Sequence, residues 1–376
     1  MTTYKLHVKL VFHNLSTVKP QYSKNIMANH EAIITPVLEN IFSGKVCHDG
    51  EDQCDYDLTE QADFAPARGV IPESFVPRLK KTVTYIVMAV IINSKNAVLM
   101  MQEAKSICNG AWYLPAGKVE EGETLEEAVK REVLEETGLE MAPTTLLAVE
   151  TARYWARFIF TGEIVGGKLK TLDNSDHHSL QAQWLLDEKA VMHRADDIKS
   201  IIELGRAHHQ YKRQQKMEPK PDPNSPSTLT WHRDVLPAIK PHRKSLLQLV
   251  VVARSKNDNK MHVLVSEKNV VHLPTCELNP FINIHVNIRK FLMDIFGSDP
   301  PLHKLGGIVH MEHCAQPVAQ NDGVLLTLVI YCKPSLDQIH LIDKYTWFSI
   351  QSDFVVESII KVFTQKNKAI LLRAIN

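Results

Sequence analysis

Residues 117–139 read GKVEEGETLEEAVKREVLEETGL, and eight of these 23 residues are glutamate. Like charges at helical spacing repel each other, at a cost of about 0.2–0.5 kcal/mol for each pair. The whole chain balances 43 basic against 43 acidic residues, so this excess is local. The segment is therefore expected either to be solvated by water or to face a positive partner.

The same segment has the pattern of an amphipathic helix. Thr124 and Glu127 have the spacing of a capping box, in which each side chain bonds the backbone of the other. Gly138 suits the end of the helix, where a positive φ is common. The face that packs on a sheet is predicted from apolar residues at helical spacing: Leu125, Ala128, Val129 and Val133.

Three glutamates of this helix form a cluster. Glu132 and Glu136 are four residues apart and share one face, and Glu135 lies beside them. Three carboxylates this close are unfavourable alone but suit Mg²⁺ or Mn²⁺, which take oxygen ligands and are often shared with substrate phosphates. Arg131 is placed to pair with one of these glutamates and hold it.

The composition is that of a globular protein with a sizeable core, at 44% hydrophobic and 23% charged residues. The balanced charge argues against a nucleic acid polymer or an acidic membrane as partner. No apolar run reaches the ~18 residues of a membrane span. The six cysteines form no CxxC pair, so structural zinc is not expected. Scattered cysteines of this kind are typical of reduced thiols, which predicts a cytoplasmic location. The basic opening segment leaves mitochondrial targeting as an alternative, although it lacks the usual arginine.

Four parts are expected along the chain. Residues 1–80 are polar and turn-rich and predict a weakly structured leader with a short helix at 32–42. Residues 81–215 alternate strands and helices, as an α/β domain does. Residues 216–243 contain six prolines from Lys216 to His242 and predict a linker. Residues 244–376 form a second α/β domain.

The second domain repeats the first. Leu114 precedes Gly138 by 24 residues, and Leu273 precedes Gly297 by the same interval. At this offset of 159 residues, Glu132, Glu135 and Glu136 are replaced by Phe291, Asp294 and Ile295. One carboxylate cannot hold the same metal cluster. The second half is therefore expected to act in packing, in formation of a homodimer or in closure over the first half.

The segment resembles the nudix box at every defined position, which are Gly117, Glu123, Arg131, Glu132, Glu135, Glu136 and Gly138. The resemblance implies a nudix α/β/α sandwich with a mixed sheet, followed by a degenerate nudix-like domain. It implies metal-dependent hydrolysis of a nucleoside diphosphate derivative. The implied metal ligands are Glu132, Glu135, Glu136 and the carbonyl of Ala116, with Glu132 or Glu136 positioning the attacking water.

The stretches around the box look like the MutT-type branch that removes phosphate from oxidised nucleoside diphosphates such as 8-oxo-dGDP. Trp112 and Phe158 are then candidates for stacking on the base, at about 1–3 kcal/mol each. Lys118 is a candidate for binding phosphate, and Asp196 and Asp197 for reading the N–H donors of 8-oxoguanine. ADP-ribose or a dinucleotide as substrate, and a non-catalytic nucleotide-binding scaffold, remain the alternatives.

Overall fold

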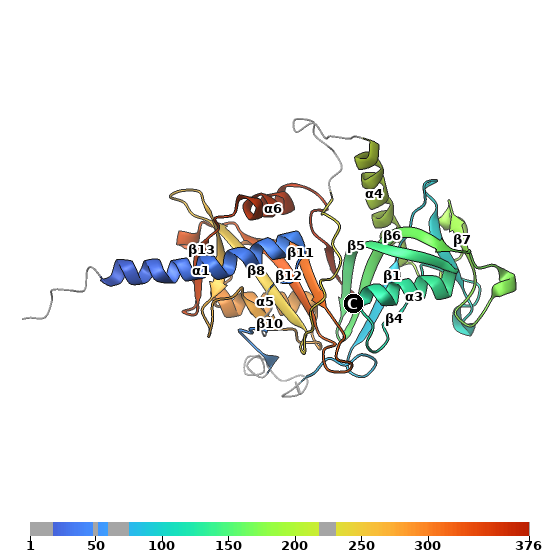
Figure 1. Ribbon diagram of the computed structural model, residues 1–376, viewed down its shortest axis with the longest axis horizontal. Coiled ribbons are helices and arrows are strands. Elements are labelled where there is room, and N and C mark those ends of the chain that lie inside the picture. Colours follow the sequence, from blue (N-terminus) through green and yellow to red (C-terminus); the bar gives the residue numbers. More distant parts are fainter. Residues whose placement is uncertain (1–17, 48–51, 59–74, 218–230, 376) are drawn as a thin grey trace, which may run out of the picture.

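The computed structural model describes residues 18–47, 52–58, 75–217 and 231–375. Two sheet-rich halves lie side by side along the long axis of the molecule (Figure 1). The first half contains the glutamate-rich helix, and the second half follows the proline-rich segment. None of the helices in the described ranges combines the length and the hydropathy that crossing a membrane requires.

The first half is an α/β/α sandwich. Its main sheet has the order β14-β5-β6-β1-β4, and a smaller sheet has the order β3-β2-β7. β1 pairs with β6 in parallel and with β4 antiparallel, so the main sheet is mixed. The strands and helices of this half are β1 Thr84–Ala89, β2 Val98–Glu103, β3 Trp112–Tyr113, β4 Ala116–Lys118, α3 Leu125–Thr137, β5 Leu139–Ala152, β6 Trp155–Gly167, β7 Ser179–Leu185 and α4 Ile198–Met217.

Alternation along the strands of the main sheet supplies an apolar face to each helix. Phe158 and Phe160 of β6 share a buried cluster with Val129 and Val133 of α3. Ile159, which points to the opposite face, belongs with the isoleucines of α4 to a second cluster. The two helices therefore cover opposite faces of the sheet, as the sequence predicted.

The second half repeats this order of elements. Its bounds are β8 Leu246–Arg254, β9 Met261–Ser266, β10 Thr275–Glu277, α5 Ile284–Phe296, β11 His303–His313, β12 Val324–Cys332, β13 Tyr345–Ser349 and α6 Asp353–Thr364. β8 pairs with β12 in parallel and with β10 antiparallel, as β1 does with β6 and β4. α3 and α5 begin and end 159 residues apart, which is the offset of the sequence repeat.

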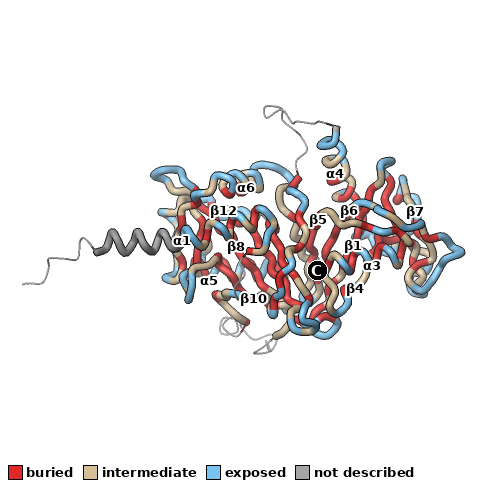
Figure 2. The backbone as a smooth tube through the Cα atoms, viewed as in Figure 1, coloured by how far each residue is buried: buried red, intermediate tan, exposed pale blue. Residues whose placement is uncertain are grey.

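The two halves are joined by shared structure. The last strand, β14 Leu371–Ala374, pairs in parallel with β5 of the first half. Val235, from the proline-rich segment, accepts a hydrogen bond at its carbonyl from Leu146 N at 2.8 Å. One apolar cluster contains buried residues of both sheets, and Figure 2 shows buried backbone running through both halves.

The leader and the linker are more ordered, where they are described, than the sequence suggested. α1 Val18–Ser43 contributes Ile34, Leu38 and Ile41 to the core of the second half, each at most 1% exposed. In the linker, Trp231 is 3% exposed. Residues 1–17, 48–51, 59–74 and 218–230 lie outside the described ranges.

Candidate active site

The helix that presents the three glutamates is capped at both ends. Thr124 Oγ1 accepts a hydrogen bond from Glu127 N at 3.2 Å, and a Glu127 carboxylate oxygen accepts one from Thr124 N at 2.8 Å. This is the predicted capping box. Gly138 ends the helix with φ of 74°, and its N–H donates to Leu134 O at 2.8 Å. The caps fix where α3 begins and therefore which side chains face β4.

Glu136 lies under β4 with an exposed fraction of 3%. Its Oε2 accepts a hydrogen bond from Ala116 N at 2.8 Å. Burial raises the pKa of Glu136 well above its ordinary value, and the Ala116 N–H lowers it only in part. The carboxylate is held in one orientation but is poorly compensated as an anion.

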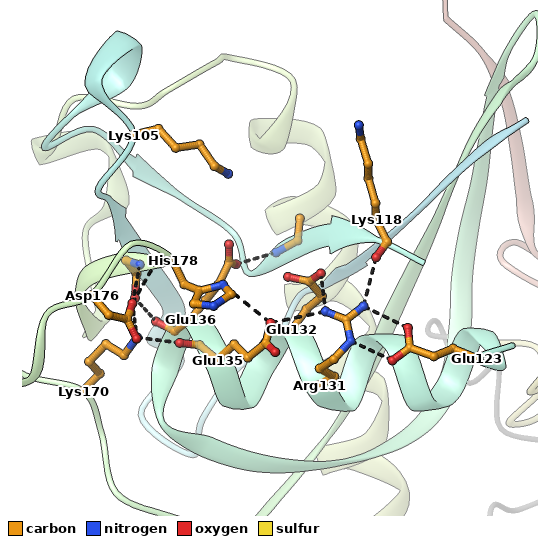
Figure 3. A network of polar contacts seen from close by, with 12 residues as sticks. Lys105, Lys118, Glu123, Arg131, Glu132, Glu135, Glu136, Lys170, Asp176 and His178 are labelled. Carbon is orange, nitrogen blue, oxygen red and sulfur yellow. Dashed lines mark hydrogen bonds and ion pairs between the residues drawn. The ribbon is translucent and has the colours of Figure 1, made fainter. Parts of the chain in front are cut away.

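Arg131 connects three other glutamates of the segment (Figure 3). Its guanidinium donates to Glu132 at 2.8 Å and to Glu135 at 3.3 Å. On its other side it donates to the two oxygens of Glu123 at 2.7 and 2.9 Å, and to the carbonyl of Lys118 at 2.9 Å. Arg131 therefore positions the carboxylates and the loop before α3, and it is a positioning residue in this geometry.

Gly117 makes room for Glu132. A Cβ at position 117 would lie 2.0 Å from the carboxyl carbon of Glu132, far inside van der Waals contact. Any larger residue would displace that carboxylate. The first glycine of the segment thus sets the close approach of β4 to α3 rather than a special backbone angle.

Further charged side chains surround the cluster. His178 Nδ1 lies 3.6 Å from Glu135 Oε2, and Lys170 donates to the carbonyl of Glu135 at 2.5 Å. Figure 3 shows Lys105 and Lys118 on the side of α3 to which Glu132 and Glu136 point. Lys118 is exposed, so its ammonium group is free to meet an anionic ligand over the carboxylates.

This set of donors fits a hard divalent cation. Burial is the main cause that raises the pKa of Glu132 as well as that of Glu136. A cation beside the two carboxylates would supply the charge that they lack, and carboxylate oxygens are the ligands that Mg²⁺ and Mn²⁺ prefer. The three carboxylates are spread along the helix face, since among the described residues they do not form a set with all donor atoms within 4.8 Å.

Comparison with known proteins agrees with this site. Residues 83–203 match the NUDIX domain. The 8-oxo-dGDP phosphatase NUDT18 of Danio rerio is 34% identical over 255 residues, which are 67% of this chain and 74% of that protein. The chain belongs to the nudix family. The Homo sapiens protein of the same name is 33% identical over 260 residues, with the same two coverages. The Mus musculus protein is 46% identical over 150 residues, which are 39% of this chain and 46% of that protein.

The resemblance stated from the glutamate-rich segment is therefore confirmed. As a nudix hydrolase, the protein acts on phosphorus-containing anhydrides, and nudix hydrolases generally need a divalent metal.

Asp197, a candidate base-reading residue, lies at the edge of a buried polar network. Its side chain is 38% exposed, and its Oδ2 accepts hydrogen bonds from Tyr113 Oη at 2.9 Å and from Arg157 at 2.7 Å. Arg157 also donates from two nitrogens to one oxygen, Oε2, of the buried Glu150, at 2.8 and 2.5 Å. A rigid, buried network therefore fixes one oxygen of Asp197, and the described residues supply no hydrogen bond to Oδ1.

Three other substrate-binding candidates have different surroundings. Phe158 is fully buried and packs edge to face on Tyr85 at 5.6 Å, so its ring has no face available to a base in this structure. Trp112 is 8% exposed and packs in the core on the α4 side. The side chain of Asp196 is 80% exposed and pairs with Lys199 at 2.8 Å on the surface. The two aromatic rings are placed by packing in the apolar core, and Asp196 is placed by its contact with water at the surface.

Sequence reasoning missed a link between the nudix helix and Asp197. Glu103, at the end of β2, is fully buried and accepts from Arg194 at 2.7 Å. The guanidinium of Arg194 lies 4.7 Å from the ring centroid of Tyr113. Lys105, 3.8 Å from Glu103, is close enough to lower the pKa of Glu136. No local pattern signals this link, because Glu103 and Arg194 are 91 residues apart.

The equivalent nudix site of the second half is closed. Phe291 and Ile295, which replace Glu132 and Glu136, are at most 1% exposed. Tyr56 of the leader packs edge to face on Phe291 at 6.2 Å, and its carbonyl accepts from Glu277 N at 2.9 Å. The leader thus covers the position where the first half presents its carboxylates, and apolar packing has replaced metal binding there.

Proposed function

We propose that the protein hydrolyses the phosphoanhydride of 8-oxo-dGDP and related oxidised nucleoside diphosphates, giving the monophosphate and phosphate with Mg²⁺ or Mn²⁺. The observation that carries this proposal is the likeness to 8-oxo-dGDP phosphatases over about two thirds of the chain, at 34% and 33% identity. It is supported by the intact acidic face of α3.

Glu132, Glu135, Glu136 and the carbonyl of Ala116 would hold the divalent cation. When bound, such a cation neutralises phosphate charge and lowers the pKa of a bound water. The remaining contributions come from the chain itself. Arg131 keeps Glu132 and Glu135 in place, and Ala116 N–H orients Glu136. Glu132 or Glu136 then accepts the proton of the attacking water.

The base would be read at Asp197. Its Oδ2 is occupied by Tyr113 and Arg157, so Oδ1 is the oxygen left to accept an N–H of the base. 8-Oxoguanine carries an N7–H donor where guanine has an acceptor. A carboxylate oxygen facing that edge would favour the oxidised base. Lys118 and Lys105, on the side to which Glu132 and Glu136 point, would meet the phosphates (Figure 3).

Turnover of 8-oxo-dGDP, dGDP, ADP-ribose and NADH with Mg²⁺ or Mn²⁺ tests the substrate. We expect 8-oxo-dGDP to have the highest kcat/KM and excess chelator to abolish the reaction. A higher kcat/KM for ADP-ribose or NADH would show that the alternative substrates are the right ones. Absence of turnover with all four compounds would favour a non-catalytic scaffold. The three retained glutamates argue against that alternative.

The role of Asp197 is tested separately with Asp197→Asn. The substitution replaces the carboxylate by an amide, which can present its NH₂ group to the base in place of an acceptor oxygen. The ratio of kcat/KM for 8-oxo-dGDP to kcat/KM for dGDP should then fall about tenfold, which corresponds to the loss of one or two kcal/mol of binding. Asp196→Asn is the matched control, because Asp196 is the neighbouring exposed acid. An unchanged ratio in Asp197→Asn would remove Asp197 from base reading without affecting the reaction assigned to α3.

A further inference from the structure

A second cluster of metal-ligating side chains lies in the other half of the molecule. Cys47, His310 and Glu312 each offer a donor atom, and these atoms all lie within 4.8 Å of one another. All three residues are buried, at 2%, 0% and 0% exposure. Cys47 follows α1, whereas His310 and Glu312 are two residues apart in β11 and lie on the same face of it. The cluster therefore joins the leader to the sheet of the second half.

The thiol and the imidazole have few other partners, whereas both oxygens of Glu312 have polar neighbours, which include Lys240 Nζ at 3.9 Å. Cys47 Sγ has a weak contact, at 3.9 Å, with Gln248 Oε1. His310 Nε2 lies 3.2 Å from Glu312 Oε1, and its Nδ1 is buried without a hydrogen-bond partner among the described residues. Because Nε2 faces Glu312, it is the ring nitrogen that this cluster offers to a cation.

A supporting layer of polar groups surrounds Glu312. His242 Nε2 contacts Glu312 Oε2 at 3.0 Å, and its Nδ1 contacts Asp52 at 2.9 Å. Cys47 N donates to Glu312 Oε1 at 2.6 Å. Ligands of bound metals are commonly oriented by outer hydrogen bonds of this kind. A β-bulge between Ile308 and His310 lies at the same point of β11, and bulges often re-aim a side chain.

We propose that Cys47, His310 and Glu312 bind a zinc ion that fastens the leader to the second half. A thiolate, an imidazole and a carboxylate are ligands of Zn²⁺, which favours four-coordinate sites with sulfur and nitrogen. The amide oxygen of Gln248, next to Cys47 Sγ, is the candidate fourth ligand. This donor set differs from the all-oxygen set on α3, so the two sites select different metals.

The site has a mechanical consequence. Cys47 lies 265 residues from Glu312 in sequence, so the ion would close a long loop and hold α1 against β11. The segment that carries Tyr56 over the degenerate nudix site begins a few residues after Cys47. Metal binding would therefore stabilise the second half and its leader without taking part in hydrolysis.

Cobalt substitution distinguishes this site from the nudix helix. A sulfur-to-cobalt charge-transfer band requires a cysteine ligand, and α3 has none. We expect the full chain, freed of metal and loaded with one equivalent of Co²⁺, to show this band and a raised unfolding temperature. Elemental analysis of protein purified without chelator should give about one zinc per chain, also in the Glu132→Gln/Glu136→Gln background.

Cys47→Ser should lose the charge-transfer band and the bound zinc. Cys332→Ser is the matched control. Cys332, like Cys47, is a buried thiol whose pKa is raised by burial, but it lies in the second half, away from the cluster. If Cys47→Ser does not fold, His310→Gln should show a zinc affinity at least tenfold lower. A wild-type chain without zinc and without the cobalt band, or equal zinc content in Cys47→Ser and Cys332→Ser, would overturn the proposal.

Discussion

Leu371 is paired in register with Ala148, so the last strand of the chain belongs to the sheet of the first half. Arg373 in the same strand lies 3.5 Å from Glu150 and donates to Ser200 at 2.8 Å. The C-terminal end therefore supports the network that holds Asp197. The second half thus contributes structure to the active half even though its own acidic cluster is lost.

A chain that ends at residue 370, just before β14, should be less stable. It loses β14 and leaves β5 as an open edge, which favours aggregation. The loss of two half-buried leucines predicts a decrease of roughly 2–3 kcal/mol in the free energy of unfolding. Urea denaturation and light scattering would measure both effects. An unchanged unfolding midpoint in a monodisperse sample would show that β14 is dispensable.

Glu136→Gln should lower kcat by about 10²–10⁴-fold, as for the loss of an acid–base or metal-positioning group. The fold should persist, because glutamine can still accept from Ala116 N and no longer carries a buried charge. Glu121→Gln serves as control, since Glu121 is an exposed carboxylate of the same segment. Steady-state kinetics at saturating Mg²⁺ decide the matter, and equal rates in the two variants would refute the role of Glu136.

Gly117→Ala should displace Glu132, because the added methyl carbon would sit 2.0 Å from the carboxyl carbon. A side-chain terminus can move, so we expect a folded protein with kcat/KM lowered about 10²-fold, as for a misplacement of about 1 Å. The double variant Gly117→Ala/Glu132→Gln should be no worse than Glu132→Gln alone. Additive losses would mean that Gly117 acts through some other contact.

Arg157→Met should destabilise the protein by about 3 kcal/mol, toward the lower end of the range for a broken buried ion pair. Glu150 is 3% exposed and would lose both hydrogen bonds to its Oε2, although Arg373 remains 3.5 Å from its Oε1. Glu150→Gln/Arg157→Met should recover part of the loss, because no uncompensated buried charge remains. Chemical denaturation of the wild type, the two single variants and the double variant measures the effect. A double variant as unstable as the sum of the single ones would contradict this explanation.

His313 should make the contact between the halves sensitive to acid. Its ring packs edge to face on Tyr85 at 6.0 Å, and burial lowers its pKa from 6.5 to about 4. His313 therefore binds a proton more readily in the unfolded chain than in the folded one. The stability that the neutral ring contributes is fully present above pH 6.5 and is lost as the pH falls toward 4. The full effect is about 3 kcal/mol at 1.36 kcal/mol per pKa unit.

His313→Phe should reduce this dependence of the unfolding free energy on pH. His303→Gln is the control, since His303 is an exposed histidine of the same strand. Urea midpoints measured from pH 7 to pH 4.5 provide the comparison. Equal pH slopes in wild type and His313→Phe would show that other groups cause the acid sensitivity.

Local sequence was sufficient for the nudix helix. The capping box, the helix-ending Gly138 and the glutamates four residues apart are interactions within 23 residues, and the structure has all of them. The repeat was also visible, because matching strands and helices keep the same spacing in both halves. Even the loss of the second acidic face followed from alignment of Phe291 and Ile295 with Glu132 and Glu136.

The buried surroundings of these elements depended on the tertiary structure. Phe158 and Trp112 looked equally suited to a base or to a core, and only packing places them in the core. The network of Glu103, Arg194 and Asp197, the pairing of Leu371 with Ala148, and the cluster at Cys47 all join residues far apart in the chain. Periodicity and capping act over a few residues, whereas such contacts exist only once distant strands have been brought together.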